Sequence, residues 1–170
     1  MTSKLSIPGD FDVIALWEAV DAQRRDRDMS WHQVTRTLRW MSQDTIARMQ
    51  ERGTSSCNHV LPMIQWVGRT PESFTVDPDG AVHELLPDPG EQGWRWWWRH
   101  RDLASALEAG RLERGLTPEQ LARELGLDKS PVKTLQRLRY GPTIGLAMIV
   151  ARWLQRPAAS FLSETPPRLQ

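Results

Sequence analysis

The sequence is poor in the residues and runs that would assign it to several well-defined protein classes. Its 170 residues include a single cysteine, Cys57, so an internal disulfide is impossible and a reducing cytoplasm is the expected location. No apolar run reaches the length of about 18 residues that a transmembrane helix needs. The first residues contain no apolar core of signal-peptide length, so secretion is not expected.

A surplus of one charge is also missing. The chain has 22 Lys and Arg against 21 Asp and Glu, a net charge of +1. The balance is uneven, with nine basic and nine acidic residues in positions 1–75, two and five in 76–100, and eleven and seven in 101–170. These counts give net charges of 0, −3 and +4. The C-terminal part is therefore basic, but we expect weak general affinity for nucleic acid.

Patterns of catalytic and metal-binding residues are sparse. Cys57 and His59 are the ingredients of nucleophilic catalysis, but side chains two residues apart diverge on a helix, and no oxyanion-hole glycine motif accompanies them. The four histidines share no metal-ligand spacing, and one cysteine cannot make a zinc site of the usual kinds. We therefore expect no enzyme, no cofactor and no metal.

The strongest positive feature is an internal repeat. A shift of 87 positions superposes several Arg, Trp and Ser-Phe residues as well as apolar ones: Arg24 on Arg111, Trp66 on Trp153, Arg69 on Arg156 and Ser73-Phe74 on Ser160-Phe161. Two unrelated helical segments would share apolar spacing but rarely these residues in step. The sequence predicts two copies of one domain, the first repeat at 10–75 and the second repeat at 101–163, joined by a linker at 76–100.

Each repeat is predicted to be all-α, with five short helices. In the first repeat Asp10 is the expected N-cap of the first helix, and Ser30 and Ser42 are expected to cap the second and third. A fourth helix near 59–67 would place Pro62 in its first turn, where proline is tolerated. A last short turn would then bury an aromatic side chain.

The linker differs in composition from both repeats. It is rich in Pro and Gly and contains four tryptophans, Trp94, Trp96, Trp97 and Trp98. Residues 75–83 could form a small hairpin around an Asp-Pro-Asp-Gly turn. We favour packing of this segment against one or both repeats, because exposed Trp is unfavourable. The alternative is that the Trp and Arg side chains stack on bases.

A pair of short helices joined by a tight turn is the most informative motif. In the second repeat Ala122 suits a close approach of two helices, Gly126 a turn with positive φ, and Val132 a place beneath the next helix. Thr117-Pro118-Glu119-Gln120 is a capping box, and Asp128 can cap the helix that follows. On these residues each repeat resembles the Xre (Cro/CI, lambda-repressor-like) helix-turn-helix family, over about three quarters of the chain.

The resemblance implies that the third helix of each repeat lies in the major groove of DNA. In the second repeat this helix is expected at 128–139, with a basic stripe at four-residue spacing. The expected base contacts come from Lys129, Ser130, Lys133 and Thr134, and the expected phosphate contacts from Arg137, Arg139 and Tyr140. The alternative is that the stripe is only a solvated helix face.

The first repeat departs from the family pattern. Thr35 and Arg39 stand where the second repeat has Ala122 and Gly126, and the turn is one residue longer. The resemblance implies base contacts from Gln43 and Arg48, since Gln can bond adenine and Arg can bond guanine, and a phosphate contact from Arg52. Asp44 and Glu51 would repel phosphate, so a structural or protein-binding copy is the alternative.

The function that follows is sequence-specific binding of double-stranded DNA by a transcriptional regulator in the cytoplasm, associated with the nucleoid. The resemblance favours a repressor. Two unequal domains in one chain would act as a covalent pseudo-dimer on two DNA boxes about 34 Å apart or a multiple of that distance. The alternative is a protein-interaction module or antitoxin-like protein, in which the first repeat or the Trp-rich linker forms a homodimer or binds a partner, and DNA is bound weakly or by the second repeat alone.

Overall fold

The computed structural model is mainly α-helical and describes residues 7–38, 41–86, 96–127 and 138–163. Its first half contains α1 (Val13–Asp26), α2 (Trp31–Leu38), α3 (Gln43–Arg52), α4 (Cys57–Val67) and the 3₁₀ turns η1 (Pro71–Phe74) and η2 (Pro78–Gly80). Its second half contains β1 (Trp97–Trp98), α5 (His100–Glu113), α6 (Pro118–Glu124), α8 (Ile144–Trp153), η3 (Ala158–Phe161) and β2 (Leu162–Ser163). None of the helices in these ranges is long and apolar enough to cross a membrane.

The two halves have matching elements. The starts of α1 and α5, of α2 and α6, of α4 and α8, and of η1 and η3 are each 87 residues apart. A short antiparallel pairing closes both halves: Trp98 pairs with Leu162, and Phe11 pairs with Thr75 in the corresponding place. Among the described residues, these four pairs of elements therefore follow the same order in both halves.

The residues that match between the repeats have structural roles. The guanidinium of Arg114 lies 4.0 Å from the ring centroid of Trp153, and Arg27 lies 5.1 Å from that of Trp66 in the corresponding pair. Arg156 over Phe161 has its counterpart in Arg69 over Phe74. The first pair of contacts joins the end of α1 to α4 and the end of α5 to α8, and the second joins the residues after α4 and α8 to the 3₁₀ turns that follow. They account for the Trp, Arg and Phe that match in the sequence.

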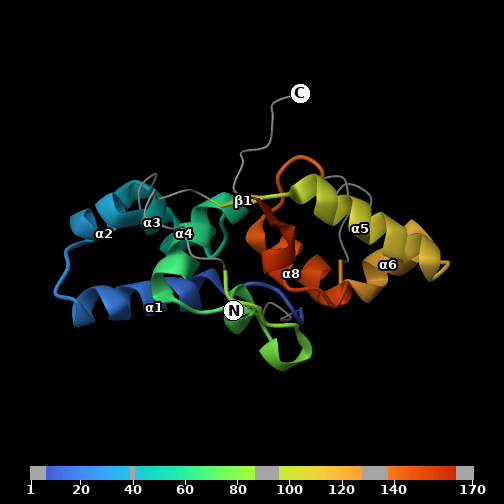
Figure 1. Cartoon of the computed structure of the whole chain (residues 1–170), viewed down its shortest axis with the longest axis horizontal. Coiled ribbons are helices and arrows are strands. Elements are labelled where there is room, and N and C mark those ends of the chain that lie inside the picture. Colours follow the sequence, from blue (N-terminus) through green and yellow to red (C-terminus); the bar gives the residue numbers. More distant parts are fainter. Residues whose placement is uncertain (1–6, 39–40, 87–95, 128–137, 164–170) are drawn as a thin grey trace.

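Equivalent positions of the two halves also contact each other. Ser56 and Thr143, which are 87 residues apart, form an antiparallel bridge, and the amide of Ile144 donates to the Ser55 carbonyl at 3.0 Å. Contacts between the same position of two copies arise when the copies are related by a twofold axis. Figure 1 agrees, since α1 and α5 lie on opposite sides of the central α4 and α8, and α2 and α6 lie toward opposite ends. We call this the inter-repeat contact.

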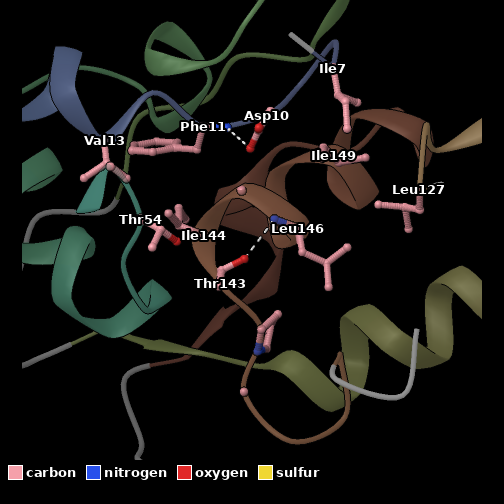
Figure 2. A pocket seen from close by; sticks show the side chains of 14 residues that line it. Ile7, Asp10, Phe11, Val13, Thr54, Leu127, Thr143, Ile144, Leu146 and Ile149 are labelled. Atoms are coloured by element: carbon pink, nitrogen blue, oxygen red, sulfur yellow. Dashed lines mark hydrogen bonds between the residues drawn. The ribbon is translucent and has the colours of Figure 1, made fainter. Parts of the chain in front are cut away.

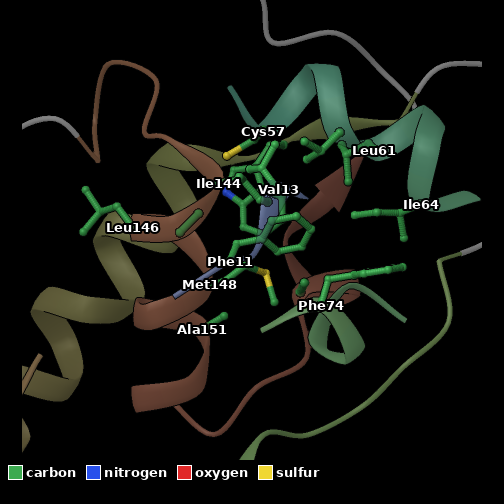
Figure 3. Packing of buried hydrophobic residues seen from close by; sticks show 14 of the residues in the cluster. Phe11, Val13, Cys57, Leu61, Ile64, Phe74, Ile144, Leu146, Met148 and Ala151 are labelled. Atoms are coloured by element: carbon green, nitrogen blue, oxygen red, sulfur yellow. The ribbon is translucent and has the colours of Figure 1, made fainter. Parts of the chain in front are cut away.

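One hydrophobic core extends through the inter-repeat contact. Buried side chains of the first half, among them Phe11, Val13 and Cys57, belong to the same cluster as Ile144 and Met148 of α8. Figure 3 shows these side chains meeting in the centre of the molecule. The halves are therefore not independent domains on a flexible linker, because separating them would expose side chains that are now at most 5% exposed.

Three local predictions are wrong. The N-cap of α1 is Asp12, whose carboxylate accepts the Ala15 amide at 2.9 Å, whereas Asp10 accepts the amide of its neighbour Phe11. Because α4 begins at Cys57, Pro62 lies in its second turn rather than its first. The hairpin at 75–83 does not form, since Thr75 pairs with Phe11 and the turn residues make η2.

The tryptophans of the linker that the structure describes do pack against the rest of the molecule. Trp97 and Trp98 form β1, which pairs with β2, and Trp98 is 2% exposed. Trp96 is partly buried against the core. Trp94 lies outside the described residues. Packing therefore accounts for the Trp96 and Trp98 side chains without base stacking.

Candidate nucleic-acid interface

An arginine fixes the turn between the first two helices of each repeat. Arg111 donates to the carbonyl of Leu116 at 2.5 Å and to both carboxylate oxygens of Glu108. Arg24, at the matching position, donates to the carbonyl of Met29 at 2.9 Å and to Asp21. Each arginine thus ties the end of its helix to the residue before the N-cap of the next helix, so the two turns are held by the same pair of interactions.

Both second helices begin with the same reciprocal cap. The Thr117 hydroxyl accepts the Gln120 amide at 3.2 Å, and the Gln120 side chain accepts the Thr117 amide at 2.7 Å. Ser30 and Gln33 make the equivalent pair at 3.3 and 2.7 Å. The capping box predicted in the second repeat is confirmed. The structure adds one in the first repeat, which the order Ser-x-x-Gln could have indicated.

The turn after α6 has the geometry that the sequence predicts. Gly126 has a φ of 67°, in the left-handed region, and the Leu127 amide donates to the Ala122 carbonyl at 2.8 Å. Ala122 is 1% exposed, as expected for a residue at a close approach. A side chain at position 126 would also press on Ile7, which precedes the first repeat. Arg39, the corresponding residue, lies outside the described residues.

The third helix of the first repeat presents a mixed surface. α3 is capped by Ser42 and packs through the buried Ile46 and Met49. The predicted contact residues Gln43, Arg48 and Arg52 are all exposed, as base and phosphate contacts require. Arg48 forms an ion pair with Asp44 one turn earlier, and both side chains are more than half exposed. DNA contact through Arg48 therefore requires release from Asp44, which is a small barrier for an exposed pair.

Most of the reading helix expected in the second repeat is not described. Lys129, Ser130, Lys133, Thr134 and Arg137 lie outside the described residues. Beyond them Leu138 is 1% exposed and anchors the chain, whereas the predicted phosphate contacts Arg139 and Tyr140 are exposed, Tyr140 to 86%. The hydrogen bond from Arg111, with a smaller contribution from the charge of Arg139, lowers the pKa of Glu108.

No family model, curated protein or solved structure matches this chain. The assignment of a function therefore depends on the geometry of its own residues.

The cysteine considered as a nucleophile is buried. The Cys57 thiol is 4% exposed and donates to the Pro142 carbonyl at 3.4 Å, across the inter-repeat contact. Burial raises the pKa of this thiol to about 12, so it remains protonated at neutral pH. Among the described residues no group of three or more His, Cys, Asp or Glu is placed to hold a metal ion.

A buried carboxylate crosses the inter-repeat contact, and sequence analysis missed it. Glu72 of η1 is 2% exposed, and its Oε1 accepts the amide of Ala158 in η3 at 2.7 Å. Its Oε2 has no hydrogen-bond partner among the described residues. Burial raises the pKa of Glu72, and the hydrogen bond from Ala158 opposes this only in part. The matching residue of the second repeat is Ala159, so the repeat pattern contained no signal for it.

We expect Glu72→Gln to stabilise the protein at neutral pH by roughly 1–2 kcal/mol. A raised folded-state pKa favours the protonated carboxyl, so the wild type is stabilised below the unfolded-state pKa. That stability is lost as pH rises through the folded-state pKa. Thermal denaturation from about pH 4 to pH 8 should show that the melting temperature of the variant, relative to that of the wild type, rises with pH. Glu51→Gln, on the exposed face of α3, should follow the wild type. A difference in melting temperature between Glu72→Gln and the wild type that stays constant with pH would contradict the raised pKa of Glu72.

Proposed function

We propose that the chain is a tandem pair of helix-turn-helix domains that binds duplex DNA and regulates transcription. The observation that supports this most directly is the repeated arginine-fixed turn, capping box and second helix in both halves. This unit holds the second helix so that a third helix can project toward a DNA groove. Two copies, each with five short helices, then make one binding protein.

The twofold relation of the halves favours DNA boxes in inverted orientation. The bridge between the equivalent residues Ser56 and Thr143 relates one half to the other by a rotation of about half a turn. A DNA-binding domain and a copy of it rotated by half a turn recognise the same base sequence on opposite strands of the duplex. Because α3 and the matching segment differ in sequence, the two boxes would be unlike. The proposed site is thus an imperfect inverted repeat, and occupancy of a promoter would make the chain a repressor.

Selection from a random duplex library tests this function. Enriched sequences should contain two unlike boxes in inverted orientation at one fixed spacing. Fluorescence anisotropy at two salt concentrations should show a specific affinity that exceeds the affinity for random duplex. Enrichment of a single box would assign DNA binding to one repeat, and no enrichment would reject the proposal.

A specific observation favours a second function, the capture of a protein partner. Acidic and basic residues alternate on the exposed face of α3, where Asp44 and Glu51 accompany Arg48. In the second half Tyr140 and Leu112 are exposed large apolar side chains, at 86% and 62%. Such side chains are typical of protein contacts. In this function the first repeat would dimerise or bind a partner, and DNA would be bound by the second repeat or weakly.

Two substitutions in the second repeat distinguish base contact from phosphate contact. We expect Lys133→Ala to relax the base preference of the selected site. Arg139→Ala should weaken binding to all sequences alike and lower the slope of log affinity against log salt by about one. Arg101→Ala, an exposed arginine in the first turn of α5, is the matched control and should leave both properties unchanged. If both variants bind as the wild type does, the second repeat does not contact DNA in this way.

A further inference from the structure

A cavity lies between the two halves, at the inter-repeat contact. It is open to solvent on one side and has a volume of about 300 Å³, the lower end of the range for small-molecule pockets. One wall is the segment that leads into α1, and the other is the start of α8. Figure 2 shows these walls facing each other, with Ile7, Asp10 and Phe11 on one side and Leu146 and Ile149 on the other.

The cavity arises where the two repeats differ. With the shift of 87 positions, Phe11 matches Trp98, Asp10 matches Trp97 and Gly145 matches Asn58. At the corresponding place of the other half Trp98 is 2% exposed, and its amide donates to the Asn58 side chain at 3.4 Å. On the cavity side an indole is replaced by a phenyl ring and an amide side chain by hydrogen. These replacements open space at a contact that is otherwise repeated.

Asp10 supplies the charge of the cavity. Its Oδ1 accepts the Phe11 amide at 2.9 Å, while Oδ2 has no hydrogen-bond partner among the described residues. None of the described Lys, Arg or His residues forms an ion pair with it. A Cβ at Gly145 would collide with Oδ1, so this glycine lets the carboxylate lie over the first turn of α8. Figure 2 shows the carboxylate pointing into the space between the walls.

The remaining lining is largely apolar, with hydroxyls at the rim. Ile7, Leu146 and Ile149 present aliphatic side chains to the cavity. Thr54 and Thr143 line it as well and are exposed, so a ligand can enter beside them from solvent. A single carboxylate among apolar walls suits a ligand with one positive charge and an apolar body.

We propose that this cavity binds a small organic ammonium ion, a protonated amine on an aromatic or branched aliphatic body. The ammonium group donates to the carboxylate of Asp10, and the apolar body displaces water from the aliphatic walls. The ligand would touch Gly53 and Thr54, which follow α3, and Thr143, the N-cap of α8. This site goes beyond DNA binding and does not depend on it.

Titration of the full chain with three probes of one shape tests the site: 2-phenylethylammonium, 2-phenylethanol and 3-phenylpropionate. We expect the ammonium ion to bind saturably with a dissociation constant on the order of 1 mM, the alcohol at least ~10-fold more weakly, and the carboxylate not measurably. Amide chemical-shift changes in the wild type should centre on Asp10, Thr54 and Gly145.

Two variants complete the test. Asp10→Asn retains an oxygen that can accept the Phe11 amide, and it should reduce binding of the ammonium ion to that of the alcohol. Glu18→Gln removes an exposed carboxylate from α1 and should change nothing. Equal binding of the three probes, shift changes away from the cavity, or ammonium binding that survives Asp10→Asn in a folded variant would each overturn the proposal. The shift map in the wild type decides the case if Asp10→Asn does not fold.

Discussion

Insertion of about five base pairs between the two boxes of a selected DNA site should lower the affinity of the chain for that site at least ~10²-fold. Half a helical turn moves the second box to the opposite face of the duplex. The chain cannot follow it, because the halves share one core and the Ser56–Thr143 bridge at the inter-repeat contact. Only one repeat could then bind its box, and the increase in affinity that comes from linking two binding domains would be lost. Anisotropy titrations of the two duplexes measure the difference.

Two further duplexes separate a rigid pair from a tethered pair. Insertion of about ten base pairs returns the second box to the same face but moves it by about 34 Å, so a rigid pair again loses affinity whereas a tethered pair regains it. The same five base pairs placed outside both boxes are the matched control and should have no effect. If insertion between the boxes behaves as that control does, the two halves do not read DNA together.

The features that sequence analysis predicted correctly are the local ones. The capping box at Thr117 and the positive φ of Gly126 depend on residues within four positions of one another, so their chemistry is visible in a short segment. Asp10 was wrongly assigned as the cap of α1 because Asp12 has the same chemistry two residues later. Choosing between two such neighbours requires the tertiary position of the helix.

The features that sequence analysis missed are contacts between distant residues where the repeats differ. A search for repeats selects residues that match, such as Trp66 and Trp153, and these hold each half together. The inter-repeat contact instead involves Glu72 opposite Ala158 and Asp10 opposite Gly145, whose matching positions in the other half carry different residue types. Thr75 likewise pairs with Phe11, 64 positions away, rather than in a local hairpin. The buried carboxylate of Glu72 and the cavity at Asp10 therefore occur where the sequences of the two repeats differ.

For DNA binding, too, sequence reasoning predicted some local features and left the arrangement of the two halves open. Both halves contain an arginine-fixed turn and a capping box before the second helix, and of these sequence reasoning predicted only the capping box at Thr117. Of the predicted contact residues, Gln43, Arg48, Arg52, Arg139 and Tyr140 are exposed, as contact with DNA requires. Exposure alone does not separate DNA contact from protein contact, since Tyr140 suits both. The spacing experiment is informative for this reason, because it depends on the relation between the halves and not on any one side chain.

The second large effect is expected at Ile144, and it concerns whether the halves unfold together. Ile144 begins α8, is 1% exposed, and belongs to the core cluster that also contains Val13 and Phe11 of the other half (Figure 3). Ile144→Ala removes buried methyl groups and leaves a cavity, so we expect a loss of about 2–4 kcal/mol in the free energy of unfolding. The wild type and the variant should each unfold in one transition, because buried residues of both halves belong to one core cluster.

Urea denaturation followed by far-ultraviolet circular dichroism and by tryptophan fluorescence tests this expectation. Tryptophans occur in both halves, among them Trp17 and Trp153, so fluorescence reports on each. The variant should show one shifted midpoint with the slope of the wild type in both signals. Leu112→Ala, which truncates a leucine that is 62% exposed on α5, is the control and should change stability by less than about 0.5 kcal/mol. A remaining transition at the wild-type midpoint would show that the first half unfolds independently. The expectation that the two repeats are rigidly placed would then be wrong, and so would the expectation that their DNA boxes need one fixed spacing.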